Sequence, residues 1–483
     1  MLFNSFSFLL FFPIVCLVYF LIRGNRLRNM FLLAASYFFY MNWEPFYALL
    51  ILTSTVITYV CGNLMEKYPD KKRILLVLCL LLNFSILFFF KYYHFVTDNI
   101  FALLSYCGIR VGFPQIKILL PVGISFYIFQ AAGYSIDIYR KTIKAEKDFF
   151  TYALFVSFFP QLVAGPIERA KNLLPQFHSF HRFSYDNFSS GAKMMLWGYF
   201  LKLCVADRLA EYTDSVYNNM QMHSSFSLIV ATIFFTFQIY GDFAGYSLIA
   251  KGCAKCLGYE LMENFRRPYL SLNVKEFWKR WHISLSSWFQ DYVYISLGGN
   301  RINFVRTLFN LLITFLISGL WHGASWNFVM WGLIHGVYLI IYNVIIKFCG
   351  SPAYKTKTSK AFGILITFVA VSFAWIFFRS DNMNDAIYAI KEIFAFKGEL
   401  FTGSKTVMLL SITSLCILIA KSLKDEFFPY GISLRFGTKK IAVSTKILDN
   451  PHPAVKICAF VLLTCYILLF GALDSHQFIY FQF

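Results

Sequence analysis

The sequence predicts an all-α polytopic membrane protein, and its composition gives the first two reasons. Of the 483 residues, 58% are hydrophobic and 20% are aromatic, and Phe alone occurs 58 times. Only 14% of the residues are charged. A soluble domain is about half apolar and about one quarter charged. The third reason is that apolar stretches of membrane-spanning length recur along the whole chain.

Each helical crossing of a bilayer needs about 20 apolar residues. The clearest stretches are 6–22, 46–64, 74–90, 226–240, 308–320, 326–346, 362–378, 407–420 and 455–473. Shorter stretches, or stretches interrupted by Gly and Pro, are 30–41, 118–138, 152–163 and 194–205. We expect some of these weaker stretches to be re-entrant or interfacial. The sequence therefore predicts about 11 to 13 membrane-embedded helices in a single domain over residues 1–483.

Basic residues outnumber acidic residues by 44 to 25. In a soluble protein this excess would suggest nucleic acid, but here it lies in short connections between apolar stretches. Cytoplasmic loops of membrane proteins carry such an excess, so we expect no nucleic-acid partner. The connections predicted to be cytoplasmic are 66–73, 140–147, 251–280, 355–360 and 421–446.

The first apolar stretch, 6–22, has no preceding positive charge and no small-residue cleavage site, and Arg23, Arg26 and Arg28 follow it. It is therefore not a cleaved signal peptide. This order of charges predicts that the N-terminus is extracytoplasmic. The basic connection 421–446, followed by a final apolar stretch, predicts that the C-terminus is extracytoplasmic too.

His282 follows a cluster of aromatic and basic residues. At helical spacing, Trp278, Trp281 and His282 share an aromatic face, while Lys279 and Arg280 lie on the other face. This pattern predicts a helix at the membrane surface that turns an imidazole toward the apolar side. A lone histidine near a helix end can equally be a satisfied core group.

His322 lies in a glycine-flanked break between the apolar stretches 307–320 and 326–346. A titratable side chain where a bilayer helix is interrupted indicates a functional site. Irregular backbone at that depth must be packed in protein or line a cavity. Histidine titrates near neutrality, so it can accept a proton from a hydroxyl and return one to a leaving group.

Several motifs around these histidines resemble the membrane-bound O-acyltransferases. They are Trp-Lys-Arg-Trp-His-Ile-Ser-Leu at 278–285, Asp-Tyr-Val-Tyr-Ile-Ser-Leu-Gly-Gly-Asn-Arg at 291–301 and Trp-His-Gly at 321–323. Phe-Pro-Gln-Leu-Val-Ala-Gly-Pro-Ile at 159–167 and Gly-Asp-Phe-Ala-Gly-Tyr-Ser at 241–247 fit the same family. The chain is most similar to the bacterial alginate and polysaccharide O-acetyltransferase branch, and the likeness is densest over residues 121–336.

This resemblance implies helices around a central intramembrane cavity in a bacterial cytoplasmic membrane. It also implies transfer of an acetyl group from cytoplasmic acetyl-CoA toward an extracytoplasmic polysaccharide, completed by an extracytoplasmic partner protein. His322 would be the general base, and His282 would position the thioester or stabilise its oxyanion. Acyl transfer needs no metal, and we expect none.

Three further residues are expected to support the site. Asp242, placed after the apolar stretch 226–240, could orient a histidine, hold a buried arginine or reach the interface from a helix end. Trp321 adjoins His322, and His335 lies within the next apolar stretch, where we expect an interhelical hydrogen bond. Gly241 and Gly245 form a GxxxG motif, which indicates a close contact between helices.

Between residues 251 and 280 there are seven Lys or Arg and three Glu. Positive-inside topology can explain this excess. The family resemblance supplies a second use, in which the phosphates of coenzyme A bind Arg266, Arg267, Lys279 and Arg280.

The C-terminal tail, residues 474–483, ends in Phe-Ile-Tyr-Phe-Gln-Phe and resembles a tail found in this branch. Aromatic rings at a chain end can serve as an interfacial anchor. Alternatively, the hydroxyl of Tyr480 could accept the acetyl group as a phenyl ester and relay it.

Two other functions fit parts of the pattern. A D-alanyl or other acyl exporter of the same family would differ only in its acyl donor. A transporter or flippase would also have many spans, broken helices and an intramembrane histidine, but it should show internal repeats, and none stands out.

Overall fold

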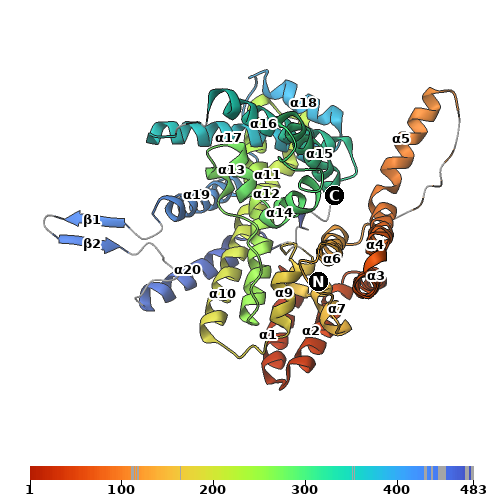
Figure 1. The fold of residues 1–483 in the computed structure, drawn as a ribbon. Helices are drawn as coiled ribbons and strands as arrows, with labels where there is room; N and C mark the ends of the chain where they lie inside the picture. Colours follow the sequence, from red (N-terminus) through yellow and green to blue (C-terminus); the bar gives the residue numbers. More distant parts are fainter. Residues whose placement is uncertain are drawn as a thin grey trace.

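A computed structural model describes most of the chain (Figure 1). The residues it does not describe are 110–111, 113, 115, 117–118, 164, 351, 353, 429–431, 437–438, 444–452, 474–477 and 480–483, together with the side chains of 432–443. Every structural statement below refers to the remaining residues.

The first half of the chain consists of short and medium helices. They are α1 (Phe6–Leu21), α2 (Asn25–Met41), η1 (Pro45–Tyr47), α3 (Ala48–Lys67), η2 (Pro69–Lys71), α4 (Lys72–Leu87), η3 (Phe88–Tyr92), α5 (Tyr93–Tyr106), α6 (Ile124–Tyr139), α7 (Phe149–Ser157), α8 (Phe159–Leu162), α9 (Ala170–Phe177), α10 (Tyr185–Tyr199), η4 (Phe200–Ala206), α11 (Asp207–Tyr217) and η5 (Met220–Met222).

The second half holds most of the long helices. The elements of this half are α12 (Ser225–Cys256), η6 (Pro268–Leu270), α13 (Val274–Arg280), α14 (Ile283–Phe289), η7 (Gln290–Tyr294), α15 (Phe304–His322), α16 (Trp326–Cys349), α17 (Lys357–Arg379), α18 (Met383–Ile393), α19 (Lys405–Phe427) and α20 (Pro453–Phe470), with strands β1 (Ile432–Phe436) and β2 (Lys439–Val443). The two strands form an antiparallel hairpin between α19 and α20.

In the described part of the chain, eight helical segments are long and apolar enough to cross a membrane. They are Pro45–Lys67, Pro69–Tyr106, Ser225–Cys256, Phe304–His322, Trp326–Cys349, Lys357–Arg379, Lys405–Phe427 and Pro453–Phe470. Phe6–Leu21 and Phe149–Leu162 are shorter apolar helices. The prediction of an all-α, multi-pass membrane protein is confirmed.

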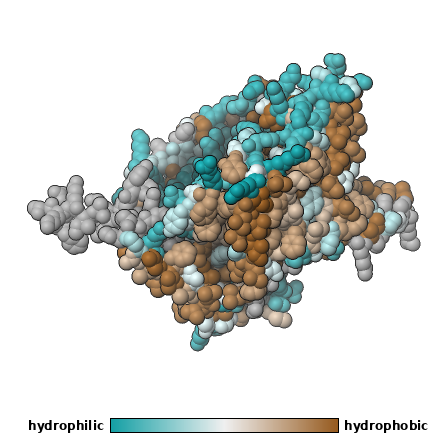
Figure 2. Space-filling model, turned by 90° about the horizontal axis from the view of Figure 1, so that it is seen from below, coloured by the Kyte–Doolittle hydropathy of each residue, from teal (hydrophilic) through white to brown (hydrophobic). Residues whose placement is uncertain are grey.

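The outer surface has the character expected of a lipid-facing protein. Figure 2 shows brown, apolar side chains spread over much of the visible face, with teal, hydrophilic ones gathered along its upper edge. Large apolar side chains such as Leu462 on α20, Phe362 on α17 and Ile74 on α4 are exposed. In a bilayer these side chains contact lipid tails, which are as apolar as they are.

Helix α12 runs through the middle of the molecule and packs against α10 and α11 (Figure 1). It is longer than predicted because Gly241 and Gly245 continue the helix. A Cβ atom on Gly245 would lie 2.8 Å from the carbonyl oxygen of Gly198 on α10. The predicted close contact between helices is confirmed, and its consequence is that Asp242 lies inside a helix and not at its end.

Helices α4 and α5 form another segment longer than predicted, visible as the orange rod at the right of Figure 1. The sequence predicts that the span ends near residue 90, where Lys91, His94 and Asp98 interrupt the apolar pattern. The structure continues the helix to Tyr106 through the π-helical turn η3. By contrast, the predicted break after His322 is confirmed, since α15 ends at His322 and α16 begins at Trp326.

Candidate active site

His322 is the last residue of α15, and its side chain is buried at 3% exposure. Its ring lies edge-on to three aromatic rings, with centroid distances of 4.9 Å to Trp321, 4.9 Å to Trp331 and 5.4 Å to Phe378. Gly323 follows in an extended conformation and ends the helix. The ring is therefore fixed by packing at an interrupted bilayer helix, as the sequence predicts.

His282 lies in different surroundings from those predicted. The prediction of a continuous surface helix is wrong, because the chain breaks between α13 and α14. His282 lies in this break and is fully buried. Its backbone is left-handed, with φ 43° and ψ 53°. Non-glycine residues rarely adopt this conformation, and such strain concentrates at functional sites.

Contacts from distant residues hold this break. The backbone amide of Ile283 donates to the carbonyl oxygen of Asn264 over 2.9 Å, and the Ser284 hydroxyl donates to the Asn264 side chain over 2.6 Å. The His282 ring lies perpendicular to Phe243, with centroids 4.5 Å apart. Burial lowers the pKa of His282 to about 3, so the imidazole is neutral at physiological pH.

The Trp321 ring contacts the rings of both histidines. Its ring centroid lies 6.1 Å from that of His282 and 4.9 Å from that of His322. Phe126 and Phe129 of α6 contact the same ring, each with a centroid distance of 5.5 Å. Two histidines that lie far apart in the chain are thereby gathered in one aromatic core.

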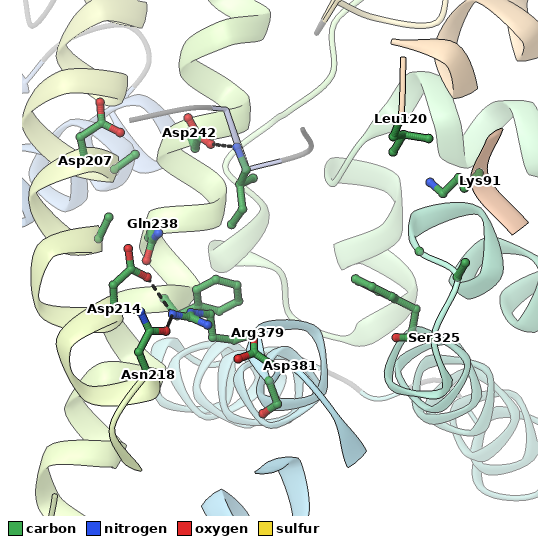
Figure 3. Close-up of a pocket in the computed structure, with 18 of the residues that line it drawn as sticks. Lys91, Leu120, Asp207, Asp214, Asn218, Gln238, Asp242, Ser325, Arg379 and Asp381 are labelled. Atoms are coloured by element: carbon green, nitrogen blue, oxygen red, sulfur yellow. Dashed lines mark hydrogen bonds and ion pairs between the residues drawn. The ribbon is translucent and has the colours of Figure 1, made fainter. Parts of the chain in front are cut away.

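One cavity adjoins His322, and a second adjoins the residues that directly follow it. The small cavity, of about 30 Å³, is lined by Trp321 and His322 together with Lys91 and the segment from Leu120 to Phe126. The polar cavity, of about 590 Å³, begins at Gly323 and Ser325 and also reaches Lys91. Figure 3 shows Asp207 and Asp242 on one side of the polar cavity and Lys91, Leu120 and Ser325 on the other.

A third cavity, here called the basic cavity, lies along α15. It measures about 360 Å³ and is lined by Thr307, Thr314 and Ser318 of α15, the last of these one helical turn before His322. Trp278, Lys275 and Lys279 of α13 form its other wall, and both lysines are exposed. Apolar walls with exposed cations suit a ligand that is apolar at one end and anionic at the other.

The chain also matches a known protein family. A model described as MBOAT, membrane-bound O-acyltransferase family, matches residues 140–384, a range that contains both histidines. The chain belongs to this family. It is therefore an O-acyltransferase, and the transporter alternative is set aside.

Relatives in this family extend over most or all of the chain. "Probable alginate O-acetylase AlgI" from Azotobacter vinelandii is 33% identical over 511 residues, covering 100% of both chains. The protein of the same name from Pseudomonas aeruginosa is 38% identical over 82% of this chain and 75% of its own. "Peptidoglycan O-acetyltransferase" from Helicobacter pylori is 34% identical over 82% of this chain and 80% of its own.

In this acyltransferase Asp242 holds a lysine, where the sequence suggested a histidine or an arginine. Its carboxylate lies 2.7 Å from the ammonium of Lys202, which also pairs with Asp207 at 2.8 Å. The other oxygen of Asp242 accepts a hydrogen bond from the backbone amide of Ile479 over 2.7 Å. Asp242 thus holds Ile479, within the C-terminal tail, at the polar cavity.

His335 does not make the interhelical hydrogen bond that the sequence predicts, because no described residue hydrogen-bonds to either ring nitrogen. Its ring lies instead among Trp278, Trp331 and Phe277, with centroid distances of 4.9, 4.9 and 6.3 Å. Trp331 contacts both His335 and His322. The contribution of His335 to the site is therefore aromatic packing.

Of the four basic residues predicted to bind phosphates, the three arginines form ion pairs with glutamates and the lysine lines a cavity. Arg266 pairs with Glu263, and Arg267 and Arg280 both pair with Glu426 of α19, at N–O distances of 2.6, 2.6 and 2.9 Å respectively. Lys279 lies apart from them in the basic cavity. A role of the three arginines in donor binding stays a prediction, and it would have to compete with these ion pairs.

Tyr480 lies outside the described residues, but its neighbours are placed. Phe478 is buried with its ring centroid 4.5 Å from that of Tyr246, and Ile479 lines the polar cavity. The sequence reasoning did not identify Lys91 or Lys202 as site residues. Lys202 lies inside the apolar stretch 194–205, and a lysine in such a stretch is itself a functional signal. Lys91 lies just beyond the stretch 74–90 and carries no such signal.

Among the described residues, no group of three or more His, Cys, Asp or Glu side chains is arranged to hold a metal ion.

Proposed function

We propose that this O-acyltransferase takes an acetyl group from acetyl-CoA at the cytoplasmic face and passes it through the membrane toward an extracytoplasmic polysaccharide. His322 acts as general base on the accepting hydroxyl, and His282 positions the thioester. The observation that carries this proposal is the position of His322 at the end of α15, where it lines the small cavity and directly precedes Gly323, which lines the polar cavity. The names of the alginate and peptidoglycan relatives support the acetyl group and the polysaccharide acceptor.

The basic cavity is the proposed entrance for the donor. The exposed ammonium groups of Lys275 and Lys279 suit the phosphates of coenzyme A, because charge-assisted hydrogen bonds to phosphate are strong. The thioester arm would then follow the wall formed by Thr314 and Ser318 toward His322. No metal is needed for this reaction.

The acyl group itself is proposed to be acetyl. The cavity beside His322 measures about 30 Å³, and a single water molecule needs about 10–15 Å³, so this cavity favours a short acyl group. A D-alanyl group is bulkier than an acetyl group. Another acyl group is therefore the second candidate, and competition between thioesters of different chain length would distinguish the two.

The polar cavity is the proposed exit. Ile479 lines this cavity. Tyr480 is the next residue in the sequence. In the proposed relay the phenol oxygen of Tyr480 bonds to the acetyl carbon, its proton goes to His322 and the coenzyme A thiolate leaves. An extracytoplasmic partner protein would then take the acetyl group from the phenyl ester and transfer it to the polysaccharide.

This scheme requires a defined orientation. The protein would lie in a bacterial cytoplasmic membrane, with the basic connections inside and both termini outside. The basic cavity and the polar cavity would then open on opposite sides. Fusions of a topology reporter to residue 1 and to residue 483 test this arrangement.

The deciding experiment is acetyl transfer by the purified protein from radiolabelled acetyl-CoA, with wild type beside His322→Ala. Loss of a general base should reduce the rate by about 10²–10⁴-fold. His178→Gln is the matched control, because it removes an exposed histidine that pairs with Glu146. A well-folded His322→Ala protein with near-normal turnover would refute the proposal.

The relay is tested separately with Tyr480→Phe, which keeps the ring and removes the hydroxyl. This variant should fold normally and fail to acetylate the polysaccharide. Intact-mass analysis of the tail peptide should find an acetyl adduct on Tyr480 in the wild type and not in His322→Ala. Full activity of Tyr480→Phe would leave the tail as an anchor only.

A further inference from the structure

A lysine from a different helix holds the end of the helix that carries His322. Lys91 lies in the π-helical turn η3, between α4 and α5. Its ammonium donates hydrogen bonds to the carbonyl oxygen of Trp321 over 2.7 Å and to that of His322 over 2.9 Å. The hydroxyl of the next residue, Tyr92, donates to the carbonyl oxygen of Leu320 over 2.8 Å.

These three carbonyl groups are the last ones of α15. The final carbonyls of a helix lack partners within the helix and carry partial negative charge, so a cation there is stabilising. Consecutive residues of a regular helix point about 100° apart. The π turn lets Lys91 and Tyr92 reach the same helix end, and turns of this kind are frequent at functional sites. The backbone of His322 is thus held by residues between α4 and α5, which lie more than 200 positions earlier in the chain.

Lys91 also lines both the small cavity and the polar cavity. It lines the small cavity together with Trp321 and His322, and it lines the polar cavity together with Gly323 and Ser325. A lysine ammonium has three N–H donors. Two of them bind the carbonyl groups of α15, and no other described residue accepts the third. The remaining donor is available to a group that enters either cavity.

We infer that Lys91 is the oxyanion donor for acyl transfer at His322, in addition to positioning the backbone of His322. This inference rests on the proposed function. The accepting oxygen bonds to the acyl carbon while His322 removes its proton, and the carbonyl electron pair moves onto the carbonyl oxygen. The third N–H of Lys91 hydrogen-bonds that oxygen. When the C–O double bond re-forms, the C–S bond breaks and the thiolate takes the proton from His322.

An ammonium suits this role better than a neutral donor. The oxygen gains a full negative charge in the tetrahedral intermediate, and hydrogen bonds between two charged groups are about twice as strong as neutral ones. The surroundings of His322 are largely aromatic and apolar, which strengthens the interaction further. The ammonium is already held in place by two carbonyl groups, so little reorganisation accompanies the reaction.

The test compares four single variants in the acetyl-transfer assay. Lys91→Met removes every donor, and Lys91→Gln keeps two N–H donors for the carbonyl groups but loses the charge. Tyr92→Phe removes only a backbone contact, and Lys147→Met removes an exposed lysine elsewhere. Hydrogen exchange over residues 318–326 reports separately on the end of α15.

Lys91→Met and Lys91→Gln should both lower kcat by about 100-fold or more, the typical effect of removing an oxyanion donor, with donor KM nearly unchanged. Hydrogen exchange near His322 should rise in Lys91→Met and Tyr92→Phe but not in Lys91→Gln. Tyr92→Phe should slow kcat far less than Lys91→Met, and Lys147→Met should match wild type.

If either Lys91→Met or Lys91→Gln folds and keeps the wild-type kcat, Lys91 is not the oxyanion donor. If Lys91→Met does not fold, the kcat of Lys91→Gln alone tests the role. His322→Ala in the same assay separates this failure from failure of the proposed function. An inactive His322→Ala beside an active Lys91 variant refutes only the role of Lys91, whereas an active His322→Ala refutes the proposed function itself.

Discussion

The backbone amide of Ile479 donates a hydrogen bond to the carboxylate of Asp242 over 2.7 Å, which ties the end of the chain to the middle of α12. The same carboxylate pairs with the buried ammonium of Lys202. One side chain therefore both neutralises a buried ammonium in the polar cavity and holds Ile479 of the C-terminal tail.

We predict that Asp242→Asn releases the tail and destabilises the fold. Breaking a buried ion pair by removing one partner costs about 3–5 kcal/mol, although here Asp207 remains beside Lys202 and reduces the loss. Limited proteolysis should cut the C-terminal tail faster in Asp242→Asn than in wild type.

Asp207→Asn is the matched control, because it also removes one carboxylate from Lys202 but leaves the bond to Ile479. It should lower thermal stability without exposing the tail. Equal protection of the tail in both variants would contradict a specific role of Asp242.

Part of this site could be predicted from sequence, and part could not. The break at His322 is visible because glycine interrupts two apolar stretches that are each long enough to span a bilayer. The left-handed break at His282 is not visible, since Asn264 causes it through hydrogen bonds made only in the folded chain. The pairing of Arg280 with Glu426 is hidden for the same reason, because the two residues lie in different helices, 146 positions apart.

The backbone of His282 allows its chemical role to be separated from its structural one. Asparagine tolerates the left-handed conformation and alanine does not, so His282→Ala should be less stable than His282→Asn by about 1 kcal/mol. Both variants should lose most acetyl transfer, because both lack the imidazole. Thermal unfolding in detergent measures the stability of each variant, and the transfer assay measures its activity. Full turnover in His282→Asn would show that His282 has only a structural role, in the break between α13 and α14.

Glu168 should make the stability of the loop near His282 depend on pH. Its carboxyl is buried, and burial raises its pKa from an ordinary value of 4.5 to about 7, although hydrogen bonds from the backbone amides of Met262 and Arg169 act in the opposite direction. The folded protein thus binds this proton more tightly than the unfolded chain does. Between about pH 4.5 and pH 7 the contribution of Glu168 to stability therefore falls as pH rises.

The measurement is the melting temperature from pH 5 to pH 8 for wild type and Glu168→Gln. The glutamine cannot ionise, so the variant should lose less stability over this range than wild type does. Glu260→Gln, which removes an exposed acid from the same region, serves as control. Parallel curves for wild type and Glu168→Gln would show that Glu168 does not titrate in this range.

Two groups of basic residues lie near the candidate donor site, and their substitution should affect the donor KM differently. Lys275 and Lys279 line the basic cavity and are exposed, whereas Arg266 already pairs with Glu263 at 2.6 Å. A hydrogen bond to a charged group contributes about 1.5–3 kcal/mol, so Lys275→Gln and Lys279→Gln should each raise the donor KM by roughly tenfold or more, with kcat little changed. Because both lysines are exposed, added salt should weaken donor binding in wild type and narrow the difference from the variants. Arg266→Gln should leave the donor KM unchanged. If Arg266→Gln raises the donor KM while the lysine variants do not, coenzyme A binds the arginine face and not the basic cavity.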